Sequence, residues 1–498
     1  MTETPATTPV SATMLTTVDA VSGEPIGSWP IDDAAAVAAV VDRARAAAPL
    51  WRELGFTERK RALRRWAAQI VNNVDEFCAL ISAENGKPTD DAYLEVITAV
   101  EHINWAAANA QKVLKPKTVW PGLMMANVAA VIEQRPHGVV GVIGPWNYPV
   151  YTPNGSIAYA LAAGNTVVFK PSELTTGIGH WFVDAFAKAN PTLPQDILSV
   201  VTGPGDTGRA LVESGVDMIA FTGSTATGKR IMAAAAQRLT PVVLECGGKD
   251  AAIVAEDADL AAAADAIVWS AMANSGQTCV GAERCYVVDS VLEQFLAEVT
   301  TRVRELAPGQ SYGPMTLPSQ IDVVADHVDD ALARGATAMF GGSDSIRAPF
   351  VGPIVLLDVP EDAPAVREET FGPTLTVRGV RDVEEAIALT NASRYGLASS
   401  VYSRKRGMEI ARALRAGATS VNSPASYAAI PALPFGGVGE SGIGRIHGAA
   451  GLLGFTRPHS IARQRFAIPG MALQSFARTE STMALVRKIT ARRFGRAK

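Results

Sequence analysis

The chain has 498 residues, of which 48% are hydrophobic and 19% are charged, and its formal net charge is −4. This length predicts two or three domains with a large core, and the composition is that of an ordinary soluble protein. The small net charge gives no reason to expect a nucleic acid as a partner. The cysteines form no CxxC pair and no dense disulfide framework, which indicates reduced thiols in a cytosolic protein. They are Cys78, Cys246, Cys279 and Cys285.

The first residues, MTETPATTPVSATM, lack the basic and apolar segments of a secretory signal and predict a loose tail. Residues 138–169 carry no formal charge, and their number would allow a membrane span. However, Gly, Pro and Asn residues between positions 144 and 155 interrupt this segment, and lipid would leave such an irregular backbone without hydrogen-bond partners. We therefore interpret it as a buried strand, a functional loop and a helix.

Ala-rich segments with apolar residues at helical spacing predict the helices of an N-terminal region, at 32–50, 57–83 and 89–113. Strand and helix signals then alternate, which predicts a mostly parallel sheet flanked by helices. We expect strands at 139–143, 166–169, 197–201, 218–221 and 242–244, and helices through 157–163, near 205–214 and from 226.

After Gly247-Gly248 the alternation restarts, which predicts a second α/β domain. We expect its strands at 252–254, 284–288, 351–357, 374–377 and 398–402, and its helices at 258–274, 290–306 and 383–390. The last segment, 478–498, has seven basic residues and one acidic residue. It is either a solvated tail or surface helix, or a basic amphipathic helix that contacts a membrane surface.

Cys279 ends the motif Ser275-Gly276-Gln277-Thr278-Cys279. A cysteine that follows a glycine turn near a helix end can be exposed and can have a lowered pKa. A single cysteine is more often a small buried apolar residue, and Cys246 and Cys285 fit that interpretation because each lies in an apolar, strand-like context. Two further motifs favour a reactive thiol at Cys279.

Glu245 stands at the end of an apolar strand, before two glycines that let the chain turn sharply. A glutamate held partly buried there would have a raised pKa and could act as a general base. A helix-capping or ion-paired glutamate is an equally good interpretation of this motif alone.

Asn147 stands in the motif Gly144-Pro145-Trp146-Asn147-Tyr148-Pro149, between two prolines that fix the loop. A rigid side-chain amide is a suitable donor to a developing oxyanion. For an isolated asparagine, a role in a turn is the commoner interpretation.

Together with several other motifs, these three resemble the aldehyde dehydrogenase superfamily. The motifs occur in the order of that family, from the first helices to Phe455, and the 34-residue step from Glu245 to Cys279 also fits. Each motif alone is weak, whereas the ordered set is specific. The matching motifs are Pro145-Trp146-Asn147-Tyr148-Pro149, Lys170-Pro171-Ser172-Glu173, Phe221-Thr222-Gly223-Ser224, Leu244-Glu245 with Gly247-Gly248-Lys249, Gly276-Gln277 with Cys279, Glu368-Glu369-Thr370-Phe371-Gly372-Pro373 and Pro434-Phe435-Gly436-Gly437.

The resemblance implies an enzyme in which the Cys279 thiolate attacks the aldehyde carbon and divides the oxidation into two easier steps. The Asn147 amide and the backbone N–H of Cys279 would hold the oxyanion. A hydride would pass to a nicotinamide, and Glu245 would activate the water that hydrolyses the thioester. Nothing favours a non-catalytic member of the family, because the Cys, Glu and Asn are all present.

The resemblance also implies NAD as the cofactor. Lys170 and Glu173 would bind the adenine ribose, and a carboxylate there favours NAD over NADP because it would repel a 2′-phosphate. Gly223-Ser224 would meet the pyrophosphate at a helix N-terminus. Glu369 and Phe371 would hold the nicotinamide ribose and ring. The remaining expected contacts are Trp146, Ser172 and Gly247.

The run from Gly223 to Arg230 nearly spells a nucleotide P-loop. The true motif ends in Gly-Lys followed by Ser or Thr, whose hydroxyl binds magnesium. Here Arg230 has that place, and a guanidinium cannot bind a cation. A P-loop nucleotide hydrolase is therefore the rival hypothesis, and it leaves the Cys, Glu and Asn unexplained.

Two positions depart from the pattern of the family. Ser156 stands where many members have Lys, and Ile446 stands where many have Glu. Both family residues have been proposed to relay protons from the base, so the sequence leaves open how Glu245 is reset. The Gly-x-x-His-Gly pattern around His447 instead resembles a branch with class 3, diapocarotenoid-aldehyde and some actinobacterial semialdehyde dehydrogenases. His447 is either a structural or a functional histidine.

The part of the site that binds the substrate is expected to be apolar, because the loop 422–435 contains no Arg or Lys. A substrate with a second carboxylate would normally require such a cation. We therefore expect an uncharged hydrophobic aldehyde, aromatic or aliphatic. Succinate semialdehyde is the alternative, because cationic contacts can come from elsewhere. The expected pocket residues are Tyr148, Tyr151, Thr152, Thr278, Val280, Tyr427 and Phe435.

By resemblance the fold is α/β, with a Rossmann-like NAD-binding domain, an α/β catalytic domain and a small β bridging extension. The extension would pair subunits by strand addition across a two-fold axis, which implies a homodimer or homotetramer. The expected bounds are 1–117 and 137–246 for NAD binding, 247–455 for catalysis, 118–136 and 456–465 for the extension, and 466–498 for the basic tail.

Overall fold

The computed structural model of the protein describes residues 13–467, 473 and 475–495. The chain divides into two compact units. The first comprises the described residues of Met1–Val113 and Pro136–Phe455, and the second those of Leu114–Arg135 and Thr456–Lys498. The first unit contains the candidate functional site, and its two larger sheets place it in the α/β class that the sequence predicts.

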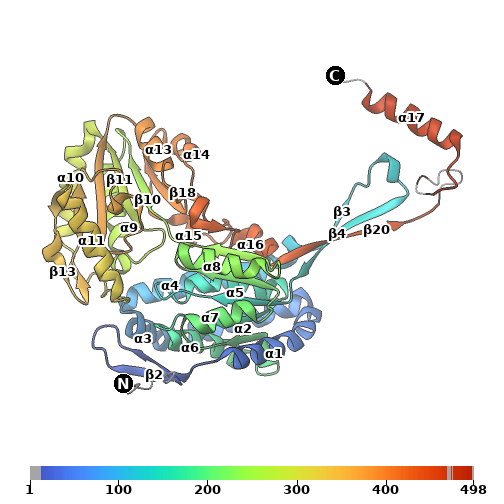
Figure 1. The fold of residues 1–498 in the computed structure, drawn as a ribbon, viewed down its shortest axis with the longest axis horizontal. Coiled ribbons are helices and arrows are strands. Elements are labelled where there is room, and N and C mark those ends of the chain that lie inside the picture. Colours follow the sequence, from blue (N-terminus) through green and yellow to red (C-terminus); the bar gives the residue numbers. More distant parts are fainter. Residues whose placement is uncertain (1–12, 468–472, 474, 496–498) are drawn as a thin grey trace, which may run out of the picture. The chain divides into compact units, whose positions relative to one another are not determined.

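One sheet of the first unit has the strand order β19-β9-β8-β5-β6-β7. All its neighbours pair in parallel except β19, which is antiparallel to β9. Parallel neighbours require crossover connections, and helices between the strands supply them (Figure 1). The strands are β5 (Val139–Ile143), β6 (Thr166–Lys170), β7 (Leu198–Val200), β8 (Met218–Thr222), β9 (Val242–Glu245) and β19 (Gly442–Ile443). The helices are α5 (Tyr151–Ala163), α6 (Thr176–Ala189), α7 (Gly205–Glu213) and α8 (Thr225–Ala236).

The other large sheet has the strand order β12-β15-β16-β11-β10-β17-β18. Its strands are parallel except β12. They are β10 (Asp250–Val254), β11 (Ala282–Val288), β12 (Thr337–Phe340), β15 (Ile354–Leu357), β16 (Thr374–Val380), β17 (Ala398–Tyr402) and β18 (Ala418–Val421). The helices around it are α9 (Leu260–Met272), α10 (Asp289–Arg304), α11 (Ser319–Ala333), α13 (Val383–Asn391) and α14 (Gly407–Ala413) (Figure 1).

This second sheet is buried on both faces. Ala252 and Val254 of β10 pack into one core cluster, with residues of α9 and α10. Ala251 and Ile253 pack into another, with residues of α13 and α14. Successive side chains of a strand point to opposite faces, so a continuous apolar run is what a strand covered by helices on both sides requires.

The N-terminal region contains a hairpin and four helices. They are β1 (Met14–Val18), β2 (Pro25–Pro30), α1 (Ala34–Glu53), α2 (Gly55–Asn72), α3 (Val74–Asn85) and α4 (Thr89–Leu114). The prediction of one helix over 57–83 is wrong, because α2 and α3 are separated at Asn73. The side chain of Asn73 donates to the carbonyl of Gln69 at 2.8 Å, and such a local bond competes with the helical backbone.

Several elements were not predicted from the sequence, and the two longest of the missed helices are α6 and α11. Helix α6 was not predicted, since it begins Thr-Gly-Ile-Gly and glycine disfavours helices. The buried carboxylate of Glu84 stabilises its start by accepting from the N–H groups of Gly177 (3.0 Å) and Ile178 (2.9 Å). Helix α11 was also missed, and the single strand expected at 351–357 is two, β14 (Phe350–Val351) and β15, separated by Gly352 and Pro353.

The two large sheets meet at their ends. Strand β9 ends at Glu245, and β10 begins at Asp250 after the two glycines. The loops that follow β5, β8 and β9 and those that precede β11 and β17 line one cavity. The carboxyl ends of one parallel sheet therefore face the amino ends of the other across this cavity, which is where open α/β sheets bind ligands.

The second unit contains a sheet of three strands, in the order β20-β4-β3. They are β3 (Lys117–Val119), β4 (Val128–Pro136) and β20 (Thr456–Gln464). A helix, α17 (Glu480–Phe494), follows near the C-terminal end and contains part of the basic segment noted in the sequence.

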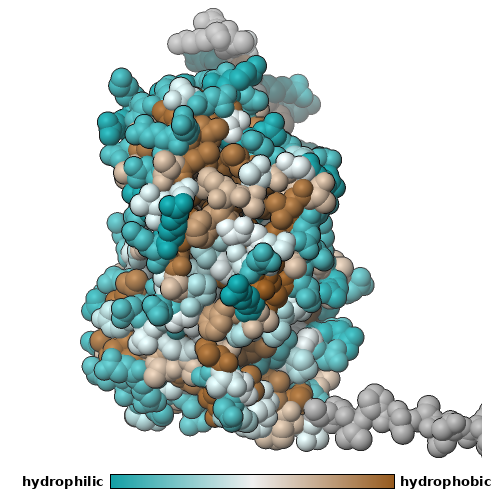
Figure 2. Space-filling view, turned by 90° about the vertical axis from the view of Figure 1, so that its left-hand side faces the viewer, coloured by the Kyte–Doolittle hydropathy of each residue, from teal (hydrophilic) through white to brown (hydrophobic). Residues whose placement is uncertain are grey.

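No helix among the described residues combines the length and hydropathy needed to cross a membrane. The charge-free segment 138–169 forms β5, a loop, α5 and most of β6, in agreement with the sequence analysis. On the face that Figure 2 shows, hydrophobic residues form separate patches among hydrophilic ones. The long apolar segments lie in the buried strands and in the helices that cover the sheets.

Candidate active site

A cavity of about 770 Å³ in the first unit brings most of the predicted site residues together. The predicted residues that line it are Trp146, Asn147, Tyr148, Tyr151, Thr152, Gly223, Ser224, Glu245, Gly247, Thr278, Cys279, Val280, Glu369, Phe371 and Phe435. The predicted residues outside its lining are Lys170, Ser172, Glu173 and Tyr427.

A tight turn after α9 brings Cys279 to the cavity. Asn274, Ser275 and Gly276 have successive φ angles of 53°, 57° and 69°, which are unfavourable for residues other than glycine. Gln277 holds this turn, because its side chain donates to the Asn274 carbonyl at 2.9 Å and accepts from the N–H of Thr316 at 2.9 Å. A buried and fully bonded turn can keep such strain, and strain of this kind is typical of functional loops.

The thiol of Cys279 is difficult to ionise in the free protein. Burial raises its pKa, and the carboxyl groups of Glu369, Asp250 and Glu245 raise it further. The expectation of a lowered pKa is therefore wrong for the free chain, because burial and the neighbouring carboxyl groups outweigh the effect of the loop position. One backbone hydrogen bond, from Val280, lowers the pKa of the thiol but does not offset these effects.

Glu245 is buried at the end of β9, with 3% of its surface exposed, and neither carboxyl oxygen is bonded to a partner among the residues that the structure describes. Burial raises its pKa well above the ordinary value, and Arg445 opposes this in part. The structure thus rules out helix capping and an ion pair as the explanation of this residue. A buried carboxyl group without protein partners is suited to exchange protons with water.

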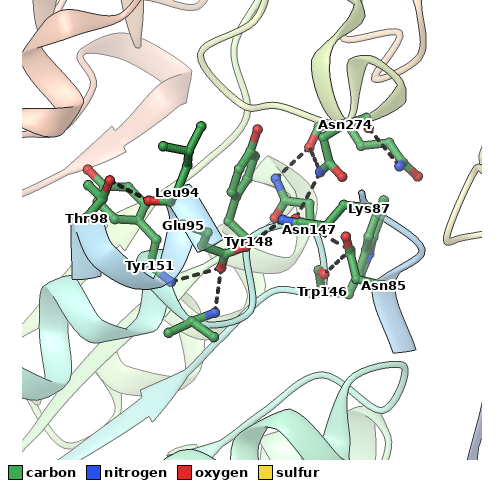
Figure 3. Close-up of polar contacts among 12 residues, drawn as sticks. Asn85, Lys87, Leu94, Glu95, Thr98, Trp146, Asn147, Tyr148, Tyr151 and Asn274 are labelled. Atoms are coloured by element: carbon green, nitrogen blue, oxygen red, sulfur yellow. Dashed lines mark hydrogen bonds and ion pairs between the residues drawn. The ribbon is translucent and has the colours of Figure 1, made fainter. Parts of the chain in front are cut away.

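Asn147 is tied to the loop of Cys279 by reciprocal bonds (Figure 3). Its side-chain N–H donates to the carbonyl of Gln277 at 2.8 Å. The side chain of Asn274 donates in turn to the carbonyl of Asn147 at 2.9 Å. A primary amide carries two hydrogens, so the second hydrogen of Asn147 is available to an oxygen atom bound beside Cys279.

The start of α8 forms one wall of the cavity. Ser224 caps this helix by accepting from the N–H of Thr227 at 3.3 Å. The first N–H groups of a helix have no partner within it, and they favour anions such as a pyrophosphate. Arg230 donates to Thr227 at 3.0 Å on the same helix.

The loop of Glu369 and Phe371 forms the adjacent wall. Glu369 accepts from the N–H of Gly248 at 3.0 Å, and burial raises its pKa to about 8. Phe371 has a φ of 53° and meets the ring of Trp146 edge-on at 5.7 Å. A carboxyl group and two aromatic rings that border one cavity fit a ribose hydroxyl and a flat ring.

Lys170, the last residue of β6, and Glu173, in the loop that follows, lie apart from this cavity. Lys170 is buried, whereas the Glu173 side chain is 47% exposed, and their charged groups are 3.5 Å apart. Burial lowers the pKa of Lys170. An ammonium and an exposed carboxylate side by side fit the two hydroxyls of a ribose, so the residues present are suited to a dinucleotide.

The comparisons with known proteins agree with this geometry. Residues 7–461 match the Aldehyde dehydrogenase family. The chain belongs to this family. It is 39% identical over 466 residues to a 4,4′-diapolycopene aldehyde oxidase of Methylomonas sp, which covers 91% of this chain and 87% of that relative. A putative NADP(+) succinate-semialdehyde dehydrogenase of Mycolicibacterium smegmatis is 37% identical over 456 residues, covering 89% of this chain and 87% of the relative.

Solved structures of the family have the same fold. An NAD-dependent aldehyde dehydrogenase from Sinorhizobium meliloti superposes with a TM-score of 0.87 at 31% identity, covering 92% of this chain and 93% of that one. This member of the aldehyde dehydrogenase family is therefore an aldehyde-oxidising oxidoreductase. The rival interpretation of residues 223–230 as a nucleotide hydrolase loop gains no support from these comparisons.

Helices α4 and α9 supply walls that the sequence analysis missed. In this aldehyde dehydrogenase, one face of α4 lines the cavity with Asp91, Leu94, Glu95 and Thr98. Their spacing, i, i+3, i+4 and i+7, is that of one helical face and was the signal available. Lys87, before α4, and Trp269, on α9, also line the cavity.

Tyr427 is not a residue of this cavity, which corrects the sequence-based expectation. The loop that contains it folds into a short helix, α15 (Ser426–Ala429). Ala428 and Ala429 of this helix line the main cavity, whereas Tyr427 lines a separate small cavity beside Asp250. A helical turn places neighbouring side chains on different faces, and apolar composition alone did not reveal this.

The branch-specific positions lie next to the cavity. Ile446 lines it, and Ser156 is buried within α5. His447 is completely buried, has a φ of 61° and lies 4.0 Å from the ring of His102. Neither ring nitrogen of His447 has a hydrogen-bond partner within the described chain. Neither a lysine at position 156 nor a glutamate at position 446 is therefore present to relay protons from Glu245.

Proposed function

We propose that this chain oxidises an uncharged hydrophobic aldehyde to the carboxylic acid with NAD+, through a thioester on Cys279. One observation carries the proposal: a thiol, a partner-free carboxyl group, a side-chain amide and a helix N-terminus border the same cavity. These are the groups that a nucleophile, a base, an oxyanion donor and a phosphate site require.

In the first half of the reaction, the Cys279 sulfur bonds to the aldehyde carbon, and the carbonyl oxygen becomes an oxyanion. The Asn147 side chain and the N–H of Cys279 donate hydrogen bonds to that oxygen. NAD+ held by Gly223-Ser224, Glu369 and Phe371 would supply the hydride acceptor that turns the adduct into a thioester. Burial and the neighbouring carboxyl groups raise the pKa of the thiol, so the thiolate would form more readily with a cationic nicotinamide ring held beside Glu369 and Phe371.

In the second half, Glu245 takes a proton from water, and the oxygen of that water bonds to the thioester carbon while the C–S bond breaks. Burial raises the pKa of Glu245, which strengthens it as a base once it is deprotonated. The acid leaves, and the Cys279 thiolate is restored.

The charges of the cavity favour an uncharged aldehyde. Lys87 is the cation among its lining residues, and its buried ammonium is 2.5 Å from Glu95. Asp91 adds a further carboxyl group at this end. A second carboxylate on the substrate would thus meet no unpaired cation, whereas apolar groups would contact Leu94 and Trp269.

Succinate semialdehyde is the second candidate substrate, because several relatives have names that refer to it. Their names also refer to NADP(+). For this chain we propose NAD, since the half-exposed carboxylate of Glu173 would repel a 2′-phosphate.

The test is NADH or NADPH formation, followed by absorbance, on hexanal, benzaldehyde and succinate semialdehyde. We expect hexanal and benzaldehyde to have the higher kcat/KM with NAD, and Cys279→Ala to abolish turnover. Cys285→Ala is the matched control, since Cys285 is buried in β11 and outside the cavity lining. Turnover by Cys279→Ala would contradict the mechanism, and a preference for succinate semialdehyde or NADP would contradict the corresponding assignment.

A further inference from the structure

The backbone carbonyl of Asn147 is a meeting point of donors from separate parts of the chain. Lys87 donates its ammonium N–H to this oxygen at 3.0 Å, and Asn274 donates its side-chain N–H at 2.9 Å (Figure 3). Asn85 adds a longer contact of 3.5 Å, and it also donates to the carbonyl of Trp146 at 2.9 Å. The peptide of Asn147 is thereby fixed from both sides.

Lys87 has a single well-defined arrangement. Its side chain is 1% exposed, and its ammonium lies 2.5 Å from a carboxyl oxygen of Glu95 and 4.1 Å from the centre of the Tyr148 ring. Burying an ammonium is costly unless ion pairs and hydrogen bonds compensate. Here Glu95, the Asn147 carbonyl and the Tyr148 ring each face one side of the nitrogen, so Lys87 cannot move without losing one of them.

Glu95 holds the same loop at a second point. Its other carboxyl oxygen accepts from the N–H of Val150 at 2.8 Å and from the N–H of Tyr151 at 3.0 Å, where α5 begins (Figure 3). The Lys87–Glu95 pair therefore spans the loop between β5 and α5, from Asn147 to Tyr151. It fixes the loop to α4, a helix that lines the same cavity.

The side chain of Asn147 depends on this peptide. Its N–H donates to the carbonyl of Gln277, two residues before Cys279. If the Asn147 peptide tilted, that bond would bend and the second hydrogen of the amide would be displaced. Displacements of about 1 Å in a catalytic group are enough to slow a reaction about 100-fold.

We propose that Lys87 is a positioning residue: its buried ammonium, neutralised by Glu95, holds the Asn147 carbonyl so that the Asn147 amide faces the oxygen of an aldehyde bonded to Cys279. This inference rests on the proposed function of Asn147 as an oxyanion donor. Lys87 contributes to the rate of acylation through Asn147 and not through contact with the substrate.

A double-mutant cycle tests the inference, with the acylation rate measured as the burst of NADH in stopped flow. Lys87→Met should lower this rate roughly 30-fold, somewhat less than loss of an oxyanion donor. In the Asn147→Ala background, the same substitution should change the residual single-turnover rate less than about twofold, because the group through which it acts is gone. The KM for the aldehyde and the Kd for NAD+ should stay within about twofold of wild type.

Two further variants keep the test decisive. Lys87→Met/Glu95→Gln removes both buried charges but keeps an acceptor for the N–H groups of Val150 and Tyr151, so it protects the fold and should show the same loss of acylation rate. Lys112→Met, at an exposed position in the last turn of α4, is the matched control and should leave the rate unchanged. Thermal unfolding reports whether each variant is folded.

The outcomes separate the two proposals. A Lys87→Met effect of the same size in the Asn147→Ala background would overturn the positioning role, because independent effects multiply. A wild-type burst from Lys87→Met/Glu95→Gln would overturn it too. If the wild-type protein forms no NADH from any aldehyde, it is the proposed function that fails.

Discussion

Glu245 and Glu369 are two buried carboxyl groups at one cavity, but their surroundings differ. Glu245 has no hydrogen-bond partner in the described chain, whereas Glu369 accepts from the N–H of Gly248. Burial raises the pKa of both, that of Glu369 to about 8. A carboxyl group free of protein partners can bind and deprotonate water, whereas one anchored to the backbone is suited to hold a ligand.

Replacement of Glu245 by Gln should separate the two halves of the reaction. The amide keeps the shape but cannot accept a proton from water, so acylation should persist while hydrolysis slows by roughly 100-fold or more. Stopped-flow absorbance should show a burst of about one NADH per active site, followed by a very slow steady state. Loss of the burst itself would mean that Glu245 is needed before the thioester forms.

The thiol of Cys279 should react slowly with alkylating agents in the free protein. Its pKa is raised by burial and by nearby carboxyl groups, and only the thiolate reacts. The rate of modification by iodoacetamide should therefore keep rising up to pH 9 without a plateau. Mass spectrometry of the modified peptide identifies the site, and Cys279→Ala is the control. A plateau below pH 8 would contradict the raised pKa.

On the scale of elements, a buried ion pair fixes the loop of Glu369 and Phe371. Glu283, in β11, accepts from the N–H of Thr370 at 2.9 Å and from that of Phe371 at 3.1 Å, and it pairs with Lys249. Lys249 also donates to the Thr370 hydroxyl at 2.9 Å. The loop that borders the candidate nicotinamide site is thus bonded to Lys249, just before β10, and to Glu283 in β11, which lie on either side of the nucleophile along the chain.

Glu283→Gln should weaken both stability and cofactor binding. It leaves the Lys249 ammonium buried without its partner, which costs about 3–5 kcal/mol of unfolding free energy. It also loosens the loop, so the KM for NAD+ should rise more than that for the aldehyde. Thermal unfolding and steady-state kinetics measure the two effects.

The matched control is Asp206→Asn. Asp206 pairs with Arg209 on the surface, where the side chains are 87% and 67% exposed, and such pairs contribute less than about 1 kcal/mol. An unchanged KM for NAD+ in a folded Glu283→Gln variant would show that the ion pair is purely structural.

The sequence predicted those elements and site residues whose signals are local. Buried parallel strands such as 139–143 and 218–221 are short apolar runs, and they were found at nearly their true bounds. Asn147, Glu245 and Cys279 each lie two residues from a Gly or Pro in a loop motif, and such a motif can be recognised in the local sequence. The bond of Lys87 to the Asn147 carbonyl and the bonds of Glu283 join segments far apart in the chain, so local sequence did not reveal them.

The missed features have the same physical cause. Helix α6 begins with glycines, and a carboxylate from α3, Glu84, stabilises its start. Tyr427 belongs to an apolar loop, but which of its side chains meet the cavity depends on a turn of α15. Both depend on tertiary contacts, and local propensity is overridden where such contacts exist.

On the scale of the whole molecule, we expect buried histidines to limit stability in acid. His102 and His447 lie between α4, α5 and the segment that follows β19. Burial lowers the pKa of His102 to about 4 and that of His447 well below its ordinary value. An unfolded histidine titrates near about 6.5, so the unfolded state takes up these protons first as the pH falls, and the free energy of unfolding decreases from about pH 6.5 to 4.

The change to examine is His102→Asn/His447→Asn. Asparagine tolerates the positive φ of residue 447 and cannot titrate, so the loss of melting temperature between pH 7 and pH 5 should become smaller than in the wild type. Calorimetry at several pH values measures this slope. His459→Asn, in β20 of the second unit, controls for the removal of a histidine as such. An unaltered slope in the double variant would assign acid sensitivity to other groups.

Self-association is the last property that the whole chain determines. The outer strands of the three-stranded sheet are β3 and β20, and outer strands offer unpaired backbone groups to another strand. Val119 and Trp120, at the end of β3, are 38% and 74% exposed, and large exposed apolar groups mark interaction sites. We therefore expect the 52.2 kDa chain to form homodimers or larger even-numbered assemblies through this sheet.

Val119→Lys/Trp120→Lys should shift the protein toward the monomer, because two ammonium groups would have to be desolvated at the interface. Light scattering coupled to size exclusion measures the mass over a range of concentrations. Leu239→Lys introduces a similar charge at a site that is 88% exposed in the first unit, and it should leave the mass unchanged. A monomeric wild type would refute the expectation, and an oligomeric double variant would mean that a different surface joins the subunits.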